Sequence, residues 1–271
     1  MRRFARLARV LLTTEYAQKL EYRAEIALWA LSGVVPLLMM SLWIHQADMA
    51  GGLGGVPAGE GGLSRLDLAR YFISAFIVRQ FTVAWVAFSF EEDALQGRLS
   101  PMLLQPLHPL WRYLTAHLAE QATRLPFVGG LAGLFLLLVP WAAWLPSPGR
   151  LLLVVLATAL AFAVNFLVQS LIAVLCFWSE RASALERLHT LAMLFLSGLM
   201  APLEVFPPAV RQAAEWTPFP WIIHFPARLL AGAEVDLVGG FAALAGWLAL
   251  LLPLTLLLWR AGVRRYAAMG G

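Results

Sequence analysis

Six long apolar runs constrain the fold of this chain more than any other feature of its sequence. Each run has about 20 residues, the length that an α-helix needs to cross a hydrocarbon layer of about 30 Å. Helices suit such runs because every backbone polar group inside a bilayer must be bonded within the protein. Charged residues make up only 13% of the chain, against about 25% in soluble domains. We therefore predict an all-α membrane protein with six transmembrane helices.

We expect residues 1–271 to form a single transmembrane domain with three parts. Residues 1–25 would form a helix at the membrane surface, residues 26–259 the six-span bundle, and residues 260–271 a cytoplasmic tail. The predicted spans are Ile26–Ile44, Leu68–Phe90, Leu125–Trp144, Leu151–Trp178, Leu185–Leu203 and Leu237–Trp259.

The N-terminal segment has an apolar stripe beside a basic face. Leu7 and Leu11 recur at helical spacing, while Arg2, Arg6 and Arg9 occupy other positions. Such a helix lies in the interface and is attracted to anionic membrane lipid. The alternative is a disordered basic tail.

The basic residues predict the orientation of the spans. If both termini are cytoplasmic, thirteen basic residues fall in inside segments and four, Arg65, Arg150, Arg211 and Arg228, in outside loops. Because short cytoplasmic loops carry the excess of Lys and Arg, we expect both the N- and the C-terminus inside.

The segment Glu91–Tyr113 joins the second and third predicted spans. It begins with Glu91, Glu92 and Asp93 and contains three prolines, so it cannot lie in hydrocarbon. The orientation places it in the cytoplasm, and its apolar residues indicate contact with a partner. A short helix near 100–105 is the best candidate for that contact.

The segment 202–236 falls on the outer side and holds six prolines, which rule out a continuous spanning helix. Its aromatic residues, among them Trp216 and Trp221, favour short helices that re-enter the outer interface. The alternative is an ordinary outer loop.

Two pairs of polar residues lie inside predicted spans: Arg79 with Gln80, and Asn165 with Gln169. A charge at the centre of a span costs about 2.5–3.5 kcal/mol on insertion scales, so Arg79 should face protein or water. Both pairs are candidates for a translocation path or a dimer seam. The alternative is hydrogen bonding between packed helices.

A third polar group precedes the third span. His117, Glu120, Gln121 and Arg124 lie on the lead-in from Leu114. We expect them on a solvated extension of the helix, with Glu120 and Arg124 paired one turn apart.

Several functional classes find no support in the sequence. The G-x-x-x-x-G-K-[ST] motif of nucleotide-binding loops is missing, since the one lysine is Lys19. The histidines and acids show no metal-ligand spacing and no nucleophile with a base. We expect no catalytic residues, no metal site and no nucleic-acid partner.

Two motifs resemble the six-span family of ABC-2-type exporter permeases. The inner loop has Gly97-Arg98-Leu99, then Leu103-Leu104, then Pro106-Leu107, with Ser100 where the family often has Glu. The outer segment is similar through Pro202, Phe206, Pro207, Pro218, Phe219, Phe225, Pro226 and Gly232. Together with the layout of spans, the resemblance covers essentially the whole chain.

The resemblance implies the transmembrane subunit of an ATP-binding-cassette exporter in the bacterial cytoplasmic (inner) membrane. The chain would bind no cofactor, pair with a second permease as a homodimer or heterodimer, and dock a separate ATPase that binds ATP and Mg²⁺. A hydrophobic or amphipathic small molecule is the expected substrate. An ATPase-independent secondary transporter is the alternative.

The resemblance also implies where the ATPase docks. The expected coupling residues are Glu91, Glu92, Gly97, Arg98, Leu99, Leu103 and Pro106. Glu180 and Arg181, between the fourth and fifth spans, form a plausible second contact, or else a solvated turn.

Overall fold

The computed structural model describes residues 2–21, 24, 28, 34–50, 62–179 and 183–269. Within these ranges every regular element is helical apart from a bridge at Gly62 and Leu63. The prediction of an all-α membrane protein is confirmed at this level.

Four helical segments of the described chain are long and apolar enough to cross a membrane, with mean hydropathies between 1.4 and 2.7. They are Arg65–Leu95, made of α4 (Arg65–Thr82) and α5 (Val86–Leu95); α7 (Pro109–Leu138); α8 (Pro148–Val174) with the turn η2 (Leu175–Phe177); and α13 (Leu237–Met269). They contain the second and sixth predicted spans, and the fourth apart from its last residue, Trp178. The third predicted span, Leu125–Trp144, is shifted toward the C-terminus relative to its helix, α7, which begins at Pro109 and ends at Leu138.

The first and fifth predicted spans remain predictions. Most of the first lies outside the described residues before α3 (Val35–Ala50). The fifth corresponds to α9 (Ser183–Leu196), whose 14 residues measure about 21 Å at about 1.5 Å per residue. It ends before the predicted boundary because the chain bends at Ser197 and Gly198, where Gly198 adopts a φ of +84°.

The remaining elements are short, apart from the N-terminal helix. They are α1 (Arg2–Glu21), α6 (Leu99–Leu103), η1 (Pro140–Ala142), η3 (Leu203–Val205), α10 (Pro208–Glu215), α11 (Phe219–Ile222) and α12 (His224–Ala231). The prediction that the proline-rich segment 202–236 forms no continuous helix is confirmed. Residues 260–269, predicted as a tail, continue α13.

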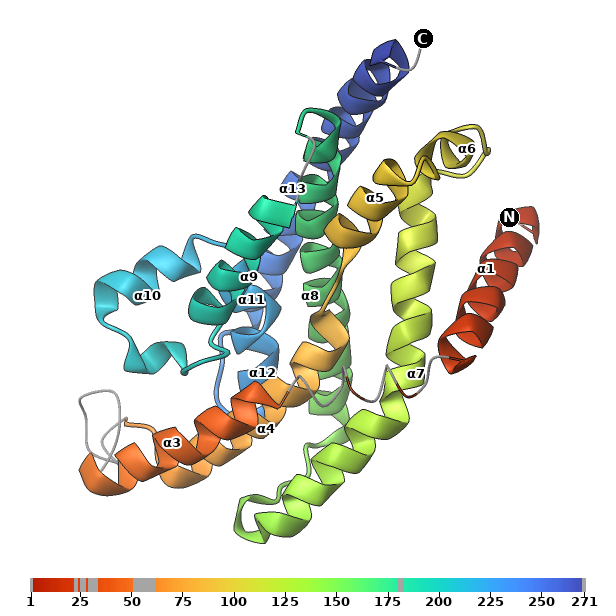
Figure 1. Cartoon of the computed structure of the whole chain (residues 1–271). Coiled ribbons are helices and arrows are strands. Elements are labelled where there is room, and N and C mark those ends of the chain that lie inside the picture. The colour runs from red at the N-terminus through yellow and green to blue at the C-terminus, as the bar shows by residue number, and fades with distance from the viewer. Residues whose placement is uncertain are drawn as a thin grey trace.

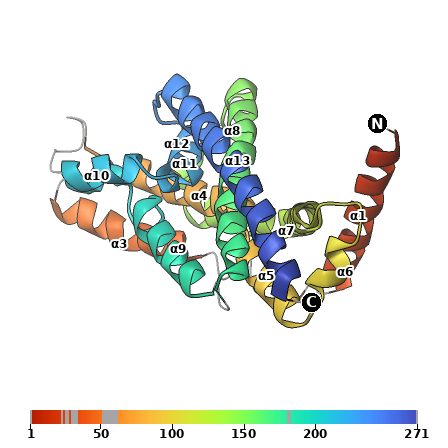
Figure 2. The ribbon, with the colours of Figure 1, turned by 90° about the horizontal axis from the view of Figure 1, so that it is seen from above.

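The central helix is α8, on which α4, α5, α12 and α13 all pack (Figures 1 and 2). In contrast, α7 packs chiefly on α1 and less extensively on α4. Figure 1 shows α6 and the C-terminal part of α13 at one end of the molecule, which we call the α6 end. The turn from α7 into α8 lies at the opposite end.

Two large apolar cores and one small one hold the helices together. The larger core includes Phe72 and Phe76 of α4, which are fully buried. At the α6 end, the rings of Phe90, Phe177 and Trp259 have centroids 5.4–5.9 Å apart in edge-to-face contacts. Aromatic pairs at this spacing stabilise a core beyond the area that they bury. This cluster joins α5, η2 and α13.

The bend after α9 requires glycine. A Cβ atom at Gly198 would lie 2.3 Å from the hydroxyl of Tyr71, and the positive φ disfavours any other residue. We expect Gly198→Ala to reduce the free energy of unfolding by about 1–3 kcal/mol. Thermal unfolding in detergent measures this. Gly130→Ala in α7, where a Cβ meets open space, is the control; equal losses in both variants would contradict the account.

Candidate functional site

The second predicted span is broken near its middle. Between α4 and α5, residues Val83–Trp85 leave the helical conformation, with ψ of 138° at Val83 and 28° at Trp85. Neither proline nor glycine occurs in this segment, which we call the helix break. A break inside a span frees backbone donors and acceptors, and each costs several kcal/mol if it stays unbonded in hydrocarbon. The protein must therefore supply partners.

Two of those partners come from α7. Nε2 of His117 accepts a hydrogen bond of 2.7 Å from the backbone N–H of Trp85. Nε2 of Gln121 donates one of 2.8 Å to the carbonyl of Phe81. Nδ1 of His117 lies 2.7 Å from the carbonyl of Tyr113, to which it can donate. This pattern matches a neutral imidazole with its proton on Nδ1.

The other two partners come from α8. Nδ2 of Asn165 donates a hydrogen bond of 2.8 Å to the carbonyl of Thr82. Oε1 of Gln169 accepts one of 3.3 Å from the backbone N–H of Ala87. Asn165 and Gln169 thus lie on the same face of α8, as predicted from their i,i+4 spacing, and that face supports the break.

His189 of α9 closes this arrangement. Its Nε2 lies 3.2 Å from Oδ1 of Asn165, and its Nδ1 lies 3.1 Å from Nε2 of Gln169. Gln169 also donates to Glu186 at 3.2 Å. With the proton of His189 on Nε2, donors and acceptors alternate from Thr82 through to Ala87. We call Asn165, Gln169 and His189 the polar ring. Sequence inspection found no metal-ligand or catalytic spacing around His189 and so missed its role here.

The lead-in to α7 corrects one prediction. His117 and Arg124 are 6% and 3% exposed, so the expected solvated extension is wrong. They are buried because α7 uses this face to support the break. Arg124 pairs with Glu120 one turn earlier, as expected, and Glu120 also binds Lys19 of α1 at 3.0 Å.

Arg79 lies on the last turn of α4, beside the break. Together with Asn165, Gln169, Glu186 and His189 it lines a pocket of about 100 Å³. Within the described part of the chain its guanidinium makes no hydrogen bond or ion pair. The neighbouring predicted residue, Gln80, is buried. The structure thus brings Arg79, Asn165 and Gln169 together around one pocket.

At the α6 end an ionic cluster fixes the turn after α5. Nε of Arg98 donates to Oδ1 of Asp93 at 2.6 Å, and its Nη2 donates to Glu92 at 3.3 Å. The hydroxyl of Tyr113 on α7 donates to the other oxygen of Asp93 at 2.7 Å. Gly97 makes the turn with a φ of +72°. Four of the predicted coupling residues therefore belong to this ionic cluster or lie next to it: Glu92, Gly97, Arg98 and Leu99.

Other contacts join this end of the molecule together. Oε2 of Glu91 accepts from the backbone N–H of Ser183 at the start of α9, at 2.7 Å. Ser100 shares a hydrogen bond of 2.8 Å with Tyr266 of α13. Leu99 is fully buried in the aromatic core. The predicted second contact, Glu180 and Arg181, lies outside the described residues.

Several of the side chains that stay exposed at this end are apolar. Leu95 is 73% and Leu104 88% exposed, and Pro101 and Pro106 are also exposed, whereas Leu103 is half-buried. We call Leu95, Pro101, Leu104 and Pro106 the α6 patch. Large exposed apolar side chains gathered at one charged end are typical of an interaction surface.

A second, half-buried ionic cluster lies near the opposite end. Glu204 accepts a hydrogen bond of 2.6 Å from Arg228 and lies 3.5 Å from Nε2 of His224. The hydroxyl of Tyr71 donates to the carbonyl of Gly198 at 2.7 Å and lies 3.0 Å from Nδ1 of His224. These contacts join the bend after α9 to α4 and α12. Nowhere in the described ranges do three His, Cys, Asp or Glu side chains meet as a metal site.

The polar ring predicts a stability effect. Gln169→Leu leaves the N–H of Ala87 without its acceptor, and we expect unfolding to become easier by about 1–2 kcal/mol. Gln212→Leu, at an exposed glutamine of α10, is the matched control and should change little. Thermal unfolding of both variants in the same detergent tests this, and equal melting temperatures would contradict a supporting role.

Glu204 predicts a pH dependence. Burial raises its pKa, but the hydrogen bond and charge of His224 and the charge of Arg228 outweigh burial and lower the pKa to about 2. A lowered folded-state pKa gives stability that is complete above the ordinary value of 4.5 and is lost as the pH falls toward 2. Glu204→Gln should therefore cost about 2 kcal/mol at neutral pH and progressively less below pH ~4.

Unfolding of Glu204→Gln and the parent protein across this pH range measures the difference. Glu215→Gln on α10, at an exposed glutamate, is the control. A cost for Glu204→Gln that stays constant down to acidic pH would contradict the ionic role of the carboxylate.

Comparison with known proteins identifies the family of the chain. Residues 62–270 match the family model described as ABC-2 family transporter protein, which covers most of the chain. The search of curated proteins finds no match. The four apolar spans agree with a multi-pass membrane protein. The chain therefore belongs to the ABC-2 transporter family, as a transmembrane permease.

Proposed function

We propose that this permease is the membrane subunit of an exporter and that it is driven by a separate ATPase subunit, which binds ATP and Mg²⁺. Both termini lie in the cytoplasm of a bacterial cell, six helices span the inner membrane, and two permease chains assemble. The α6 patch carries the proposal, since it joins two spans and exposes apolar side chains. Because the chain has no nucleotide-binding motif, a separate subunit would have to hydrolyse ATP, and this surface would be its docking site.

The contacts around α6 support its use as a coupling element. Arg98 ties the turn before α6 to α5, and Tyr113 ties the same cluster to α7. Ser100 ties α6 to α13. Force applied to α6 by an ATPase would therefore reach three helices, and through Glu91 it would reach α9 as well.

The helix break supports a further step in the mechanism. Because residues 83–85 are not helical, α5 can turn relative to α4 without breaking a continuous ladder of helical hydrogen bonds. Such a turn would alter the pocket that Arg79 lines. We place the path of an amphipathic substrate along this pocket, with Arg79 toward its polar group.

A secondary transporter is the second candidate, favoured by the same break. Discontinuous helices at mid-membrane are common in transporters driven by ion gradients. Export that persists without the ATPase and stops when the ion gradient is collapsed would identify this class.

The α6 patch predicts the effect of a charge. We expect Leu104→Asp to weaken association with the ATPase at least about tenfold, because a carboxylate would be buried in an apolar contact. Leu145→Asp is the matched control, since Leu145 is 94% exposed and lies in the turn between η1 and α8. Quantitative co-purification with the ATPase measures both. Equal recovery of ATPase with the two variants would contradict the docking assignment.

Replacing Arg79 should impair transport without impairing assembly with the ATPase. We expect Arg79→Gln to lower the export rate about tenfold or more, since a charge-assisted contact contributes about 1.5–3 kcal/mol. Recovery of the ATPase should be unchanged. The export rate in vesicles and the yield of the complex are measured on the same preparation, and normal export would return Arg79 to a purely structural role.

A further inference from the structure

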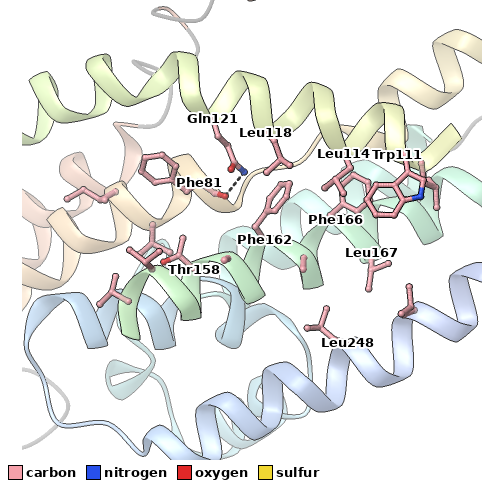
Figure 3. Close-up of a pocket in the computed structure, with 18 of the residues that line it drawn as sticks. Phe81, Trp111, Leu114, Leu118, Gln121, Thr158, Phe162, Phe166, Leu167 and Leu248 are labelled. Atoms are coloured by element: carbon pink, nitrogen blue, oxygen red, sulfur yellow. Dashed lines mark hydrogen bonds between the residues drawn. The ribbon is translucent and has the colours of Figure 1, made fainter. Parts of the chain in front are cut away.

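The pocket beside the helix break carries charged groups. It has a volume of about 100 Å³, is lined by both Arg79 and Glu186, and is called the break pocket below. A larger groove of about 1,220 Å³ lies between α7, α8 and α13 (Figure 3), and its described lining residues include no Asp, Glu, Lys or Arg. Of these two cavities, the break pocket is therefore the one that can distinguish ligands by their charge.

Arg79 lines the break pocket without a partner of its own. It is half-buried on the last turn of α4, and its guanidinium makes no hydrogen bond or ion pair within the described ranges. The carboxylate of Glu186 is already occupied, since it accepts hydrogen bonds from Gln169 at 3.2 Å and from Thr190 at 3.1 and 3.2 Å. An ionisable side chain inside a span is costly and normally has a partner. The guanidinium therefore offers its N–H donors to a ligand.

The surrounding charges do not neutralise Arg79. Arg124 is a second cation, near enough for its charge to oppose that of Arg79. Glu120 is shared between Arg124 and Lys19. The two imidazoles beside the break bond as neutral rings. Even with Glu186 ionised, the described part of this region holds three cations against two carboxylates, and a buried charge without a counter-charge is unfavourable. One positive charge is thus left for a ligand to balance.

The size of the break pocket limits what can enter it. Pockets for drug-sized ligands measure about 300–1,000 Å³, so a volume of about 100 Å³ accepts only a small part of such a molecule. A guanidinium can bind a carboxylate through two parallel hydrogen bonds, and a carboxylate brings the one negative charge that the region lacks. Met193 and Leu194 of α9, with Leu199 just after it, make another part of the lining apolar. That part suits the beginning of a hydrocarbon chain.

We propose that the break pocket binds the carboxylate of an amphipathic monocarboxylic acid through Arg79, and that such acids are the class of substrate exported. This inference rests on the proposed function, because it takes the pocket as part of the export path. A cationic amphiphile would bring a like charge beside Arg79. A phosphate monoester carries about −1.5 to −2 elementary charges at neutral pH, more than the single charge that is left to balance.

Equilibrium dialysis of the full-length permease in detergent, without the ATPase, tests the carboxylate. The probes are decanoate and decanol, which have the same chain and differ in the charge of the polar group. We expect decanoate to bind at least about tenfold more tightly, because only the acid pairs its charge with that of Arg79. Arg79→Gln should remove this preference and Arg79→Lys should keep part of it. Arg65→Gln, at an exposed arginine of the same helix, is the control and should leave the preference unchanged.

Three results of the dialysis would overturn the proposal. They are equal affinities of the parent protein for the two probes, no saturable binding of decanoate, and an unchanged preference in Arg79→Gln. The comparison of the two probes on the parent protein stands even if Arg79→Gln does not fold.

ATP hydrolysis by the complex tests whether the bound acid is a substrate. In liposomes that contain the permease with its ATPase, decanoate should stimulate hydrolysis and decanol should not, and Arg79→Gln should lose the stimulation. Decanoate that binds the permease without stimulating hydrolysis overturns the substrate class. If no ATPase assembles with the permease, the proposed function fails, whereas the dialysis result still decides whether the pocket binds a carboxylate.

Discussion

The hydrogen bonds around the helix break are the interactions on which the rest of the structure depends. A span of 31 residues that loses its helical ladder at residues 83–85 would leave bare amides in hydrocarbon. Four side chains from α7 and α8 satisfy those groups, and His189 links two of them. At this level, hydrogen bonds between polar groups thus fix how α4 and α5 pack against α7, α8 and α9. Apolar packing alone would allow many registers.

The same arrangement divides the molecule into two working parts. Beyond the break, α5 contacts α7 through Asp93 and α9 through Glu91, and α6, which follows it, contacts α13 through Ser100. Before the break, α4 joins α3, α12 and the bend after α9 through its apolar core and Tyr71. In the proposed exporter, the first part receives force from the ATPase and the second faces the opposite side of the membrane. The helix break is where they meet.

The sequence predicted the parts of this fold that follow from hydrophobicity and proline. Four spans, the short helix α6 and the broken outer segment are read directly from those signals. The helix break was not predicted because Val83–Trp85 has no proline or glycine to mark it. Without the break, nothing in the sequence requires a partner for Trp85, so His117 resembled a solvated residue. The i,i+4 pair Asn165 and Gln169 was found because spacing alone places it on one face.

The end of α9 shows the other limit. Apolar composition continues through Leu203, but a glycine with positive φ bends the chain at Gly198. A glycine can either continue a helix or bend the chain with a positive φ, so the residue type alone does not predict the bend. The close approach of Tyr71, which only the folded structure shows, accompanies the bend.

The most direct test of the account is whether the helix break acts as a hinge. Spin labels at Arg65 of α4 and Phe88 of α5, both exposed, would report the distance across the break in a protein with Cys176 replaced by serine. Labels at Leu152 and Trp178, along the unbroken α8 and its end, provide the control. The account predicts that trapping ATP in the ATPase complex changes the first distance and leaves the second unchanged. If neither distance changes while export is active, the break is a static feature and the coupling route proposed through α5 is wrong.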